Sequence, residues 1–97
     1  MIEFVKVQGV KFPLGQIVFT HGIVALVQGG LNITPYLMRH AKGDWGDMDD
    51  EDKEANDTAL RIGYRVLSSY NINEHTKIWI ITEQDRSATT VLLPEEY

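Results

Sequence analysis

The chain lacks cysteine, long apolar runs and any excess of basic residues, and each absence excludes a class of protein. Without cysteine it has no disulfide, no thiolate nucleophile and no cysteine-based zinc or iron–sulfur site. No apolar stretch is long enough to span a bilayer, and the first residues lack the basic and apolar regions of a signal peptide. We therefore expect no membrane association and a reducing, cytoplasmic location.

Acidic residues outnumber basic residues by 14 to 9, which gives a formal net charge of −5. A general nucleic-acid binder needs a basic face, so we expect no direct nucleic-acid binding. The acids crowd one segment, where carboxylates at a helix start would favour the positive end of the helix dipole. The alternative is a partner-binding surface that docks on a basic protein or imitates a phosphate backbone. Its candidate residues are Asp47, Asp49, Asp50, Glu51, Asp52 and Glu54.

Length and hydrophobic patterning predict a single α+β domain over residues 1–97. A hydrophobic content of 43% is ordinary for a globular protein, and a chain of this length can bury one modest core. Cap residues, glycines and apolar periodicity predict helices over residues 21–27, 36–42 and from 47–49 to about 62, and strands over 1–10, 16–19, 64–70, 77–82 and 88–93. We expect an antiparallel β-meander with two to three short helices packed on one face. The run 77–82 is apolar on both faces, which predicts a central strand with Trp79 in the core. The predicted buried stripe of the third helix is Ala55, Ala59, Leu60 and Ile62.

Two polar segments concentrate the side chains that could do chemistry. Their members are Arg39, His40, Asp44 and Trp45 in the first segment, and Glu83, Asp85 and Arg86 in the second. His40 is the most versatile, because its charge can switch near neutral pH. It could act as a general base held by Asp44 or Asp47, or it could be a structural histidine that bonds the last carbonyls of a helix.

Trp45 and Arg86 each carry a structural and a functional interpretation. Trp45 could be a lid or a binding anchor, but the burial of a large aromatic ring favours a loop plug. Arg86 could take part in a reaction, but a bidentate pair with a carboxylate would lock the two polar segments together. We favour the structural interpretation for both residues.

The spacing of the potential ligand side chains does not favour a metal or cofactor site. The three histidines show no i, i+4 spacing of the kind that holds zinc. Oxygen ligands for Mg²⁺ or Ca²⁺ are conceivable at Asp44, Asp47 and Asp49, but the register of an EF-hand loop is absent. We expect no metal and no cofactor.

The chain resembles a family of short bacterial proteins that are often labelled only as plasmid-related proteins. The resemblance spans roughly residues 14–97 and rests on Arg39-His40, Gly43-Asp44-Trp45-Gly46-Asp47, Arg65 to Tyr70 and, most specifically, Ile78 to Tyr97. Where relatives tend to read Thr-Pro-Gly-Ala, this chain has Thr20-His21-Gly22-Ile23. The family implies residence on plasmids, phages or integrated elements, and it implies no established activity or catalytic residue.

Two hypotheses follow. The first is a small acidic accessory protein of a mobile element that binds a host or element-encoded protein complex, in an anti-restriction or anti-CRISPR role. The second is a small hydrolase or nuclease that uses His40 with Asp44 or Asp47 and Arg86, although no motif pairs a nucleophile with a base. An exposed strand at the edge of the meander could also support a homodimer.

Overall fold

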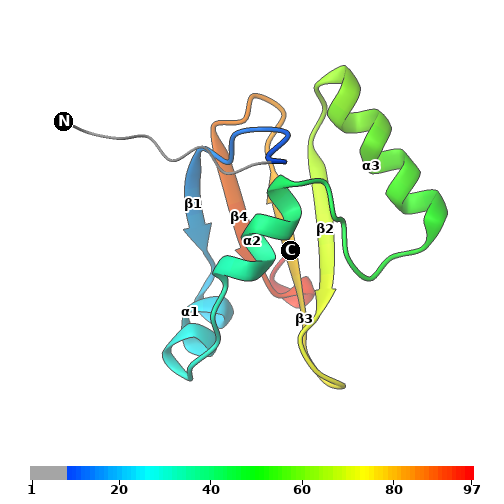
Figure 1. Ribbon diagram of the computed structural model, residues 1–97. Helices are drawn as coiled ribbons and strands as arrows, with labels where there is room; N and C mark the ends of the chain where they lie inside the picture. The colour runs from blue at the N-terminus through cyan, green and yellow to red at the C-terminus, as the bar shows by residue number, and fades with distance from the viewer. Residues whose placement is uncertain (1–8) are drawn as a thin grey trace.

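The computed structural model describes residues 9–97, so the strand predicted over residues 1–10 lies almost wholly outside the described part. The elements are β1 (Gln16–Phe19), α1 (His21–Gln28), α2 (Thr34–Ala41), α3 (Asp50–Ile62), β2 (Val66–Asn71), β3 (Lys77–Thr82), β4 (Ala88–Leu92) and the 3₁₀ turn η1 (Pro94–Glu96). The predicted α+β class is confirmed (Figure 1). No helix among residues 9–97 is long and apolar enough to cross a membrane.

The four strands form one mixed sheet in the order β1-β4-β3-β2. Strands β2, β3 and β4 are the predicted antiparallel meander, with Ser68 opposite Ile80 and Ile80 opposite Val91. Strand β1 departs from the expectation because it runs parallel to β4. A parallel neighbour needs a long crossover connection, and here the three helices carry the chain from β1 to the far edge of the sheet.

Helices α1 and α2 cover one face of the sheet (Figure 1). The main hydrophobic cluster joins these helices to the three meander strands through Ile23, Ile33, Tyr70, Ile78, Ile80 and Val91. Trp79 points to the opposite face because side chains alternate along a strand. It is half-buried against Tyr97, with ring centroids 5.8 Å apart, and it is not the fully buried core residue that the apolar run predicts.

Helix α3 begins and ends where its cap residues predict. The Asp49 side chain accepts a hydrogen bond from the Asp52 amide at 3.0 Å, and Gly63 ends the helix in the left-handed region with φ 83°. The predicted buried stripe is formed only in part, because no residue of α3 is fully buried, Ala55 is exposed and Ile62 is 54% exposed. Ala59 and Leu60 pack against a second cluster of Phe12, Trp45 and Val66, at the β2 margin of the sheet.

Candidate functional site

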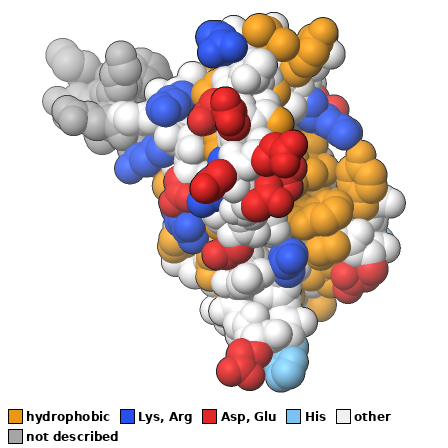
Figure 2. Space-filling model, turned by 90° about the vertical axis from the view of Figure 1, so that its right-hand side faces the viewer, with side chains coloured by type: hydrophobic (Ala, Val, Ile, Leu, Met, Phe, Trp, Pro, Cys, Tyr) orange, Lys and Arg blue, Asp and Glu red, His pale blue; other side chains and the backbone are white. Residues whose placement is uncertain are grey.

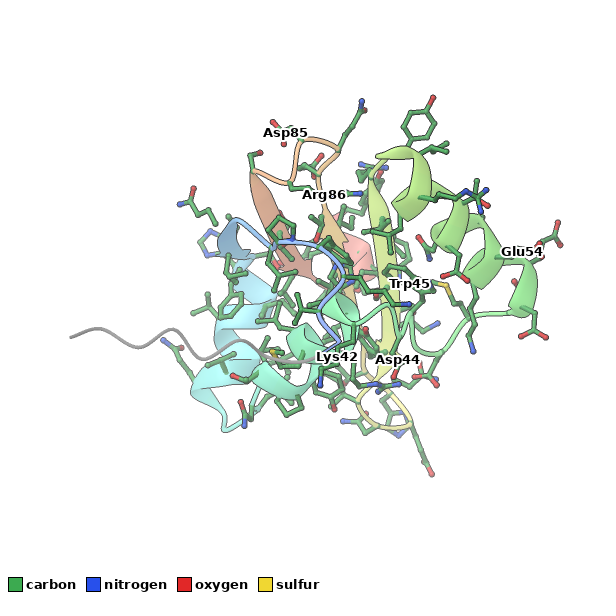
Figure 3. The ribbon with its side chains drawn as sticks, turned by 45° about the horizontal axis from the view of Figure 1, so that its top comes forward. Lys42, Asp44, Trp45, Glu54, Asp85 and Arg86 are labelled. Carbon is green, nitrogen blue, oxygen red and sulfur yellow. The ribbon has the colours of Figure 1, made fainter. Side chains whose placement is uncertain are left out.

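The predicted polar cluster comes from three segments and does not line one cleft. Arg39 and His40 lie in the last turn of α2, Asp44 and Trp45 lie in the next loop, and Glu83, Asp85 and Arg86 lie in the turn between β3 and β4. In the view of Figure 3, Arg86 lies above Trp45 and Asp44 lies below it. His40 is 0% exposed whereas Asp44 is exposed, so these two side chains do not line a common cleft.

His40 is enclosed by two aromatic rings and by the polar side chains of the sheet. The rings of Phe12 and Trp45 approach it edge-on, with centroids 5.3 Å and 5.7 Å away. Nδ1 contacts the Ser68 hydroxyl, and Nε2 lies 2.8 Å from Oγ1 of Thr82. Both ring nitrogens are therefore occupied inside the protein, and the structural interpretation of His40 fits, although its partners are strand hydroxyls rather than helix carbonyls.

The hydrogen-bond chain around His40 has one direction, because it ends on a carbonyl that can only accept. Thr89 Oγ1 donates to the Leu14 carbonyl at 2.6 Å, so Thr89 must accept from Thr82 at 2.7 Å. Thr82 then accepts from Nε2–H of His40, and Nδ1 accepts from Ser68. This arrangement assigns the neutral Nε2–H tautomer to the ring.

Burial is also the main cause that lowers the pKa of His40, to about 3, with a further contribution from the positive charge of Arg86. The ring therefore stays neutral at physiological pH. A general base needs access to a substrate proton, and a fully enclosed ring with both nitrogens bonded has none. His40 organises the core where α2 meets β2, β3 and β4.

Arg39 and Asp44 form the one Arg–carboxylate ion pair among the described residues. Arg39 Nε donates to Asp44 Oδ2 at 2.7 Å and Nη2 donates to Oδ1 at 3.3 Å, and the guanidinium stacks 4.6 Å from the Tyr70 ring centroid. The hydrogen bond lowers the pKa of Asp44 and raises that of Arg39. The pair joins the end of α2 to its own following loop.

Arg86 is bound to backbone groups rather than to the acidic loop. Its Nη1 donates to the carbonyls of Tyr64 and Glu83 at 2.9 Å and 3.1 Å, and the guanidinium lies 5.3 Å from the Phe12 ring centroid. Asp85 accepts the Ser87 amide at 3.0 Å in the same turn. The expected bidentate pair is therefore made by Arg39, and Arg86 ties the turn to the start of β2.

Trp45 plugs the loop before α3, as predicted, and this loop closes the outer edge of β2. The ring is 3% exposed and Nε1 donates to Asp57 of α3 at 2.8 Å. The Trp45 carbonyl accepts the Ser69 amide at 3.0 Å, and the Asp47 amide donates to the Ser69 carbonyl at 2.6 Å. Asp47 also accepts the Asn71 amide at 2.8 Å.

Asn56 of α3 bonds the outer edge of β2 at the next outward-pointing residue, Leu67. Its side-chain amide donates to the Leu67 carbonyl at 2.7 Å and accepts the Leu67 amide at 3.1 Å. One side chain thus takes the place of a neighbouring strand. The outward backbone groups of β2 are engaged at residues 67, 69 and 71, which are alternate positions along one edge.

The remaining acids form an exposed face at the start of α3. Asp50, Glu51, Asp52 and Glu54 are exposed, and none has an ion-pair partner among the described residues. The nearby Asp49 carboxylate raises the pKa of Asp52, which shows how closely the like charges crowd. No three His, Asp or Glu side chains within residues 9–97 are placed to hold a metal ion.

A shallow groove of about 360 Å³ connects this acidic face to the sheet face that carries no α-helix among the described residues. Figure 2, which views the molecule from the side of α3, shows the acidic side chains beside a hydrophobic patch. The groove is lined by Asp47, Met48, Asp49, Asp52, Leu67, Ser69, Lys77 and Trp79. It combines an apolar floor with a mainly acidic rim.

Sequence patterns did not identify the partners of His40 or the role of Asn56. Thr82 does continue the alternate positions of Ile78 and Ile80, so its inward direction could be read from the strand period. Its register partner Thr89 depends on the turn between the strands, and Ser68 depends on where α2 docks. No local signal marks Asn56 as a cap for a strand edge.

No protein-family model, curated protein or solved structure matches the chain.

Proposed function

We propose that this protein is a small non-enzymatic binding module that docks on a basic protein surface through the acidic face of α3 and the adjoining groove. The observation that carries the proposal is that some of the polar residues are bonded within the fold and others are not. His40, Arg39, Asp44 and Arg86 are bonded within the fold, whereas the acids at the start of α3 are exposed and unpaired among the described residues.

The groove adds an apolar contact area to this charged surface. Leu67 and Trp79 offer an apolar floor beside Asp49 and Asp52. Apolar and aromatic contacts at the centre of an interface supply most of its affinity, while charges at the rim steer association and choose the partner. The expected partner surface therefore presents an apolar side chain surrounded by Lys and Arg.

The resemblance to plasmid-related proteins supports a more specific version of the proposal. In that version the partner belongs to a restriction or CRISPR-type complex, whose nucleic-acid-binding surface is basic, and the acidic face competes with phosphates for it. The version rests on the resemblance and on charge. The enzyme hypothesis lacks a comparable observation, because the enclosed His40 has no free nitrogen for a substrate.

The test compares capture of proteins from host lysate by the wild type and two variants that each lose four negative charges. The first carries Asp50→Asn, Glu51→Gln, Asp52→Asn and Glu54→Gln, and it keeps the Asp49 cap. The control carries Glu74→Gln, Glu83→Gln, Asp85→Asn and Glu95→Gln, away from the groove. A basic partner held by the wild type and the control, and lost by the first variant, supports the proposal. Equal capture by all three proteins, or no specific partner, contradicts it.

A further inference from the structure

Strand β1 presents an open edge among the described residues. The amides of Gln16 and Thr20 donate to carbonyls at Ser87 and Val91, beside β4. Because backbone groups point to alternate sides along a strand, the groups of Ile17 and Phe19 point away from the sheet. No described residue bonds them.

The stretch of chain that contains this edge has no charged side chain, and the nearest carboxylate, that of Glu96, is held by Thr20 and the Gly22 amide beyond the end of β1. Residues 12–38 contain no Asp, Glu, Lys or Arg, although the chain has 23 such residues in total. Ile17, Val18 and Phe19 are 39%, 39% and 37% exposed. Edge strands are normally protected by charge, proline or a covering segment, and residues 16–19 have neither charge nor proline.

We propose that β1 pairs antiparallel with β1 of a second copy of this chain, which joins two sheets across a two-fold axis at Val18. In this register Ile17 of each copy lies opposite Phe19 of the other. The backbone groups of these two residues point out of the sheet, so each Ile17–Phe19 pair exchanges two backbone hydrogen bonds, one pair on either side of the axis. The Val18 residues form the non-hydrogen-bonded pair between them. An identical strand thus satisfies every outward group of the edge.

Charge favours a second copy over a charged partner at this edge. Each copy has a net charge of −5, so self-association requires a surface on which like charges do not meet. The acidic helix α3 lies beside β2, at the opposite edge of the sheet from β1 (Figure 1). Pairing through β1 therefore places the two acidic faces at the outer ends of the dimer, where they stay accessible and far apart.

A single cysteine tests the register directly, because the natural chain has none. The Cα atoms of a non-hydrogen-bonded antiparallel pair lie about 4.5 Å apart, which a disulfide can bridge. Under mild oxidation we expect Val18→Cys to form a disulfide-linked dimer at least about tenfold faster than Ile62→Cys, an exposed control on α3. Sedimentation velocity of the wild type over a concentration series should show a reversible dimer.

Val18→Lys places two like charges at the axis and should raise the dimer dissociation constant at least about tenfold, with Ile62→Lys as its control. Three results would overturn the proposal. The first is equal cross-linking at positions 18 and 62, and the second is a dimer that Val18→Lys leaves unchanged. The third is a monomer at all concentrations, in which protection of the Ile17 and Phe19 amides from hydrogen exchange would point to a covering segment of the same chain.

Discussion

The two edges of the sheet treat their outward backbone groups in opposite ways. Along β2, the loop before α3 and the Asn56 side chain bond residues 67, 69 and 71. Along β1, the groups of Ile17 and Phe19 have no partner among the described residues. The closed edge carries the acidic helix, whereas the open edge lies in a charge-free stretch. In the two proposals made above, the charged face beside β2 binds one kind of partner and the apolar strand β1 binds another.

Gly46→Ala should have the largest effect, because it breaks the closed edge at its tightest contact. Gly46 has φ 87°, and a Cβ there would lie 2.1 Å from the Ser69 carbonyl oxygen. We expect a loss of about 3 kcal/mol in the free energy of unfolding from strain and displacement of the loop. Gly63→Ala has a similar φ of 83° and open space, so in urea unfolding it should lose only about 1 kcal/mol. Equal losses would mean that the contact with β2 contributes nothing.

Asn56→Ala should rank second, since it leaves the backbone of Leu67 without its two side-chain partners. The lost hydrogen bonds are partly buried, and we expect a decrease of about 2 kcal/mol in the free energy of unfolding. Hydrogen exchange should also show faster exchange at the Leu67 amide. Glu54→Ala, on the exposed side of the same helix, should stay within about 0.5 kcal/mol of the wild type. A comparable loss in both variants would assign the effect to α3 as a helix, not to the edge.

Lowering the pH should decrease the free energy of unfolding through the buried ring of His40. Because the folded-state pKa of His40 is lowered to about 3 from an unfolded value of 6.5, the unfolded chain binds the proton first as pH falls. The contribution of the neutral His40 ring to the free energy of unfolding is therefore complete above pH 6.5. It declines below that pH, by about 2 kcal/mol at pH 5. Urea unfolding at pH 7 and pH 5 measures this change. His75→Gln should keep the pH dependence and His40→Gln should abolish it, and the reverse pattern would place the titrating group elsewhere.

Ile17→Thr should have the smallest effect on stability, because the side chain is 39% exposed at the open edge. We expect a loss below about 1 kcal/mol in the free energy of unfolding, with the β-branched shape retained. The same substitution should weaken dimer formation measurably by sedimentation. A large loss of monomer stability with unchanged association would show that the β1 edge is part of the core and not a contact surface.

Local features of the fold were predictable from residues near one another in the chain. Asp49 and Gly63 mark the ends of α3 because a side-chain cap and a left-handed glycine act within one helical turn. The apolar run 77–82 predicted an inner strand, and β3 does lie between β2 and β4. The predicted buried stripe of α3 formed only at Ala59 and Leu60, because helix burial depends on where the sheet margin lies, which the helix sequence does not contain.

The candidate site was predictable as a set of residues but not as an arrangement. The sequence determined that His40, Arg39, Asp44 and Arg86 would be polar and potentially reactive, and that the acids would crowd the start of α3. Tertiary structure decided that His40 would be enclosed and neutral, that Arg39 rather than Arg86 would hold the carboxylate, and that β1 would run parallel to β4 at an open edge. The physical reason is distance along the chain. A cap acts across three residues, whereas the hydrogen-bond chain that fixes His40 ends on a contact between residues 75 positions apart, Leu14 and Thr89.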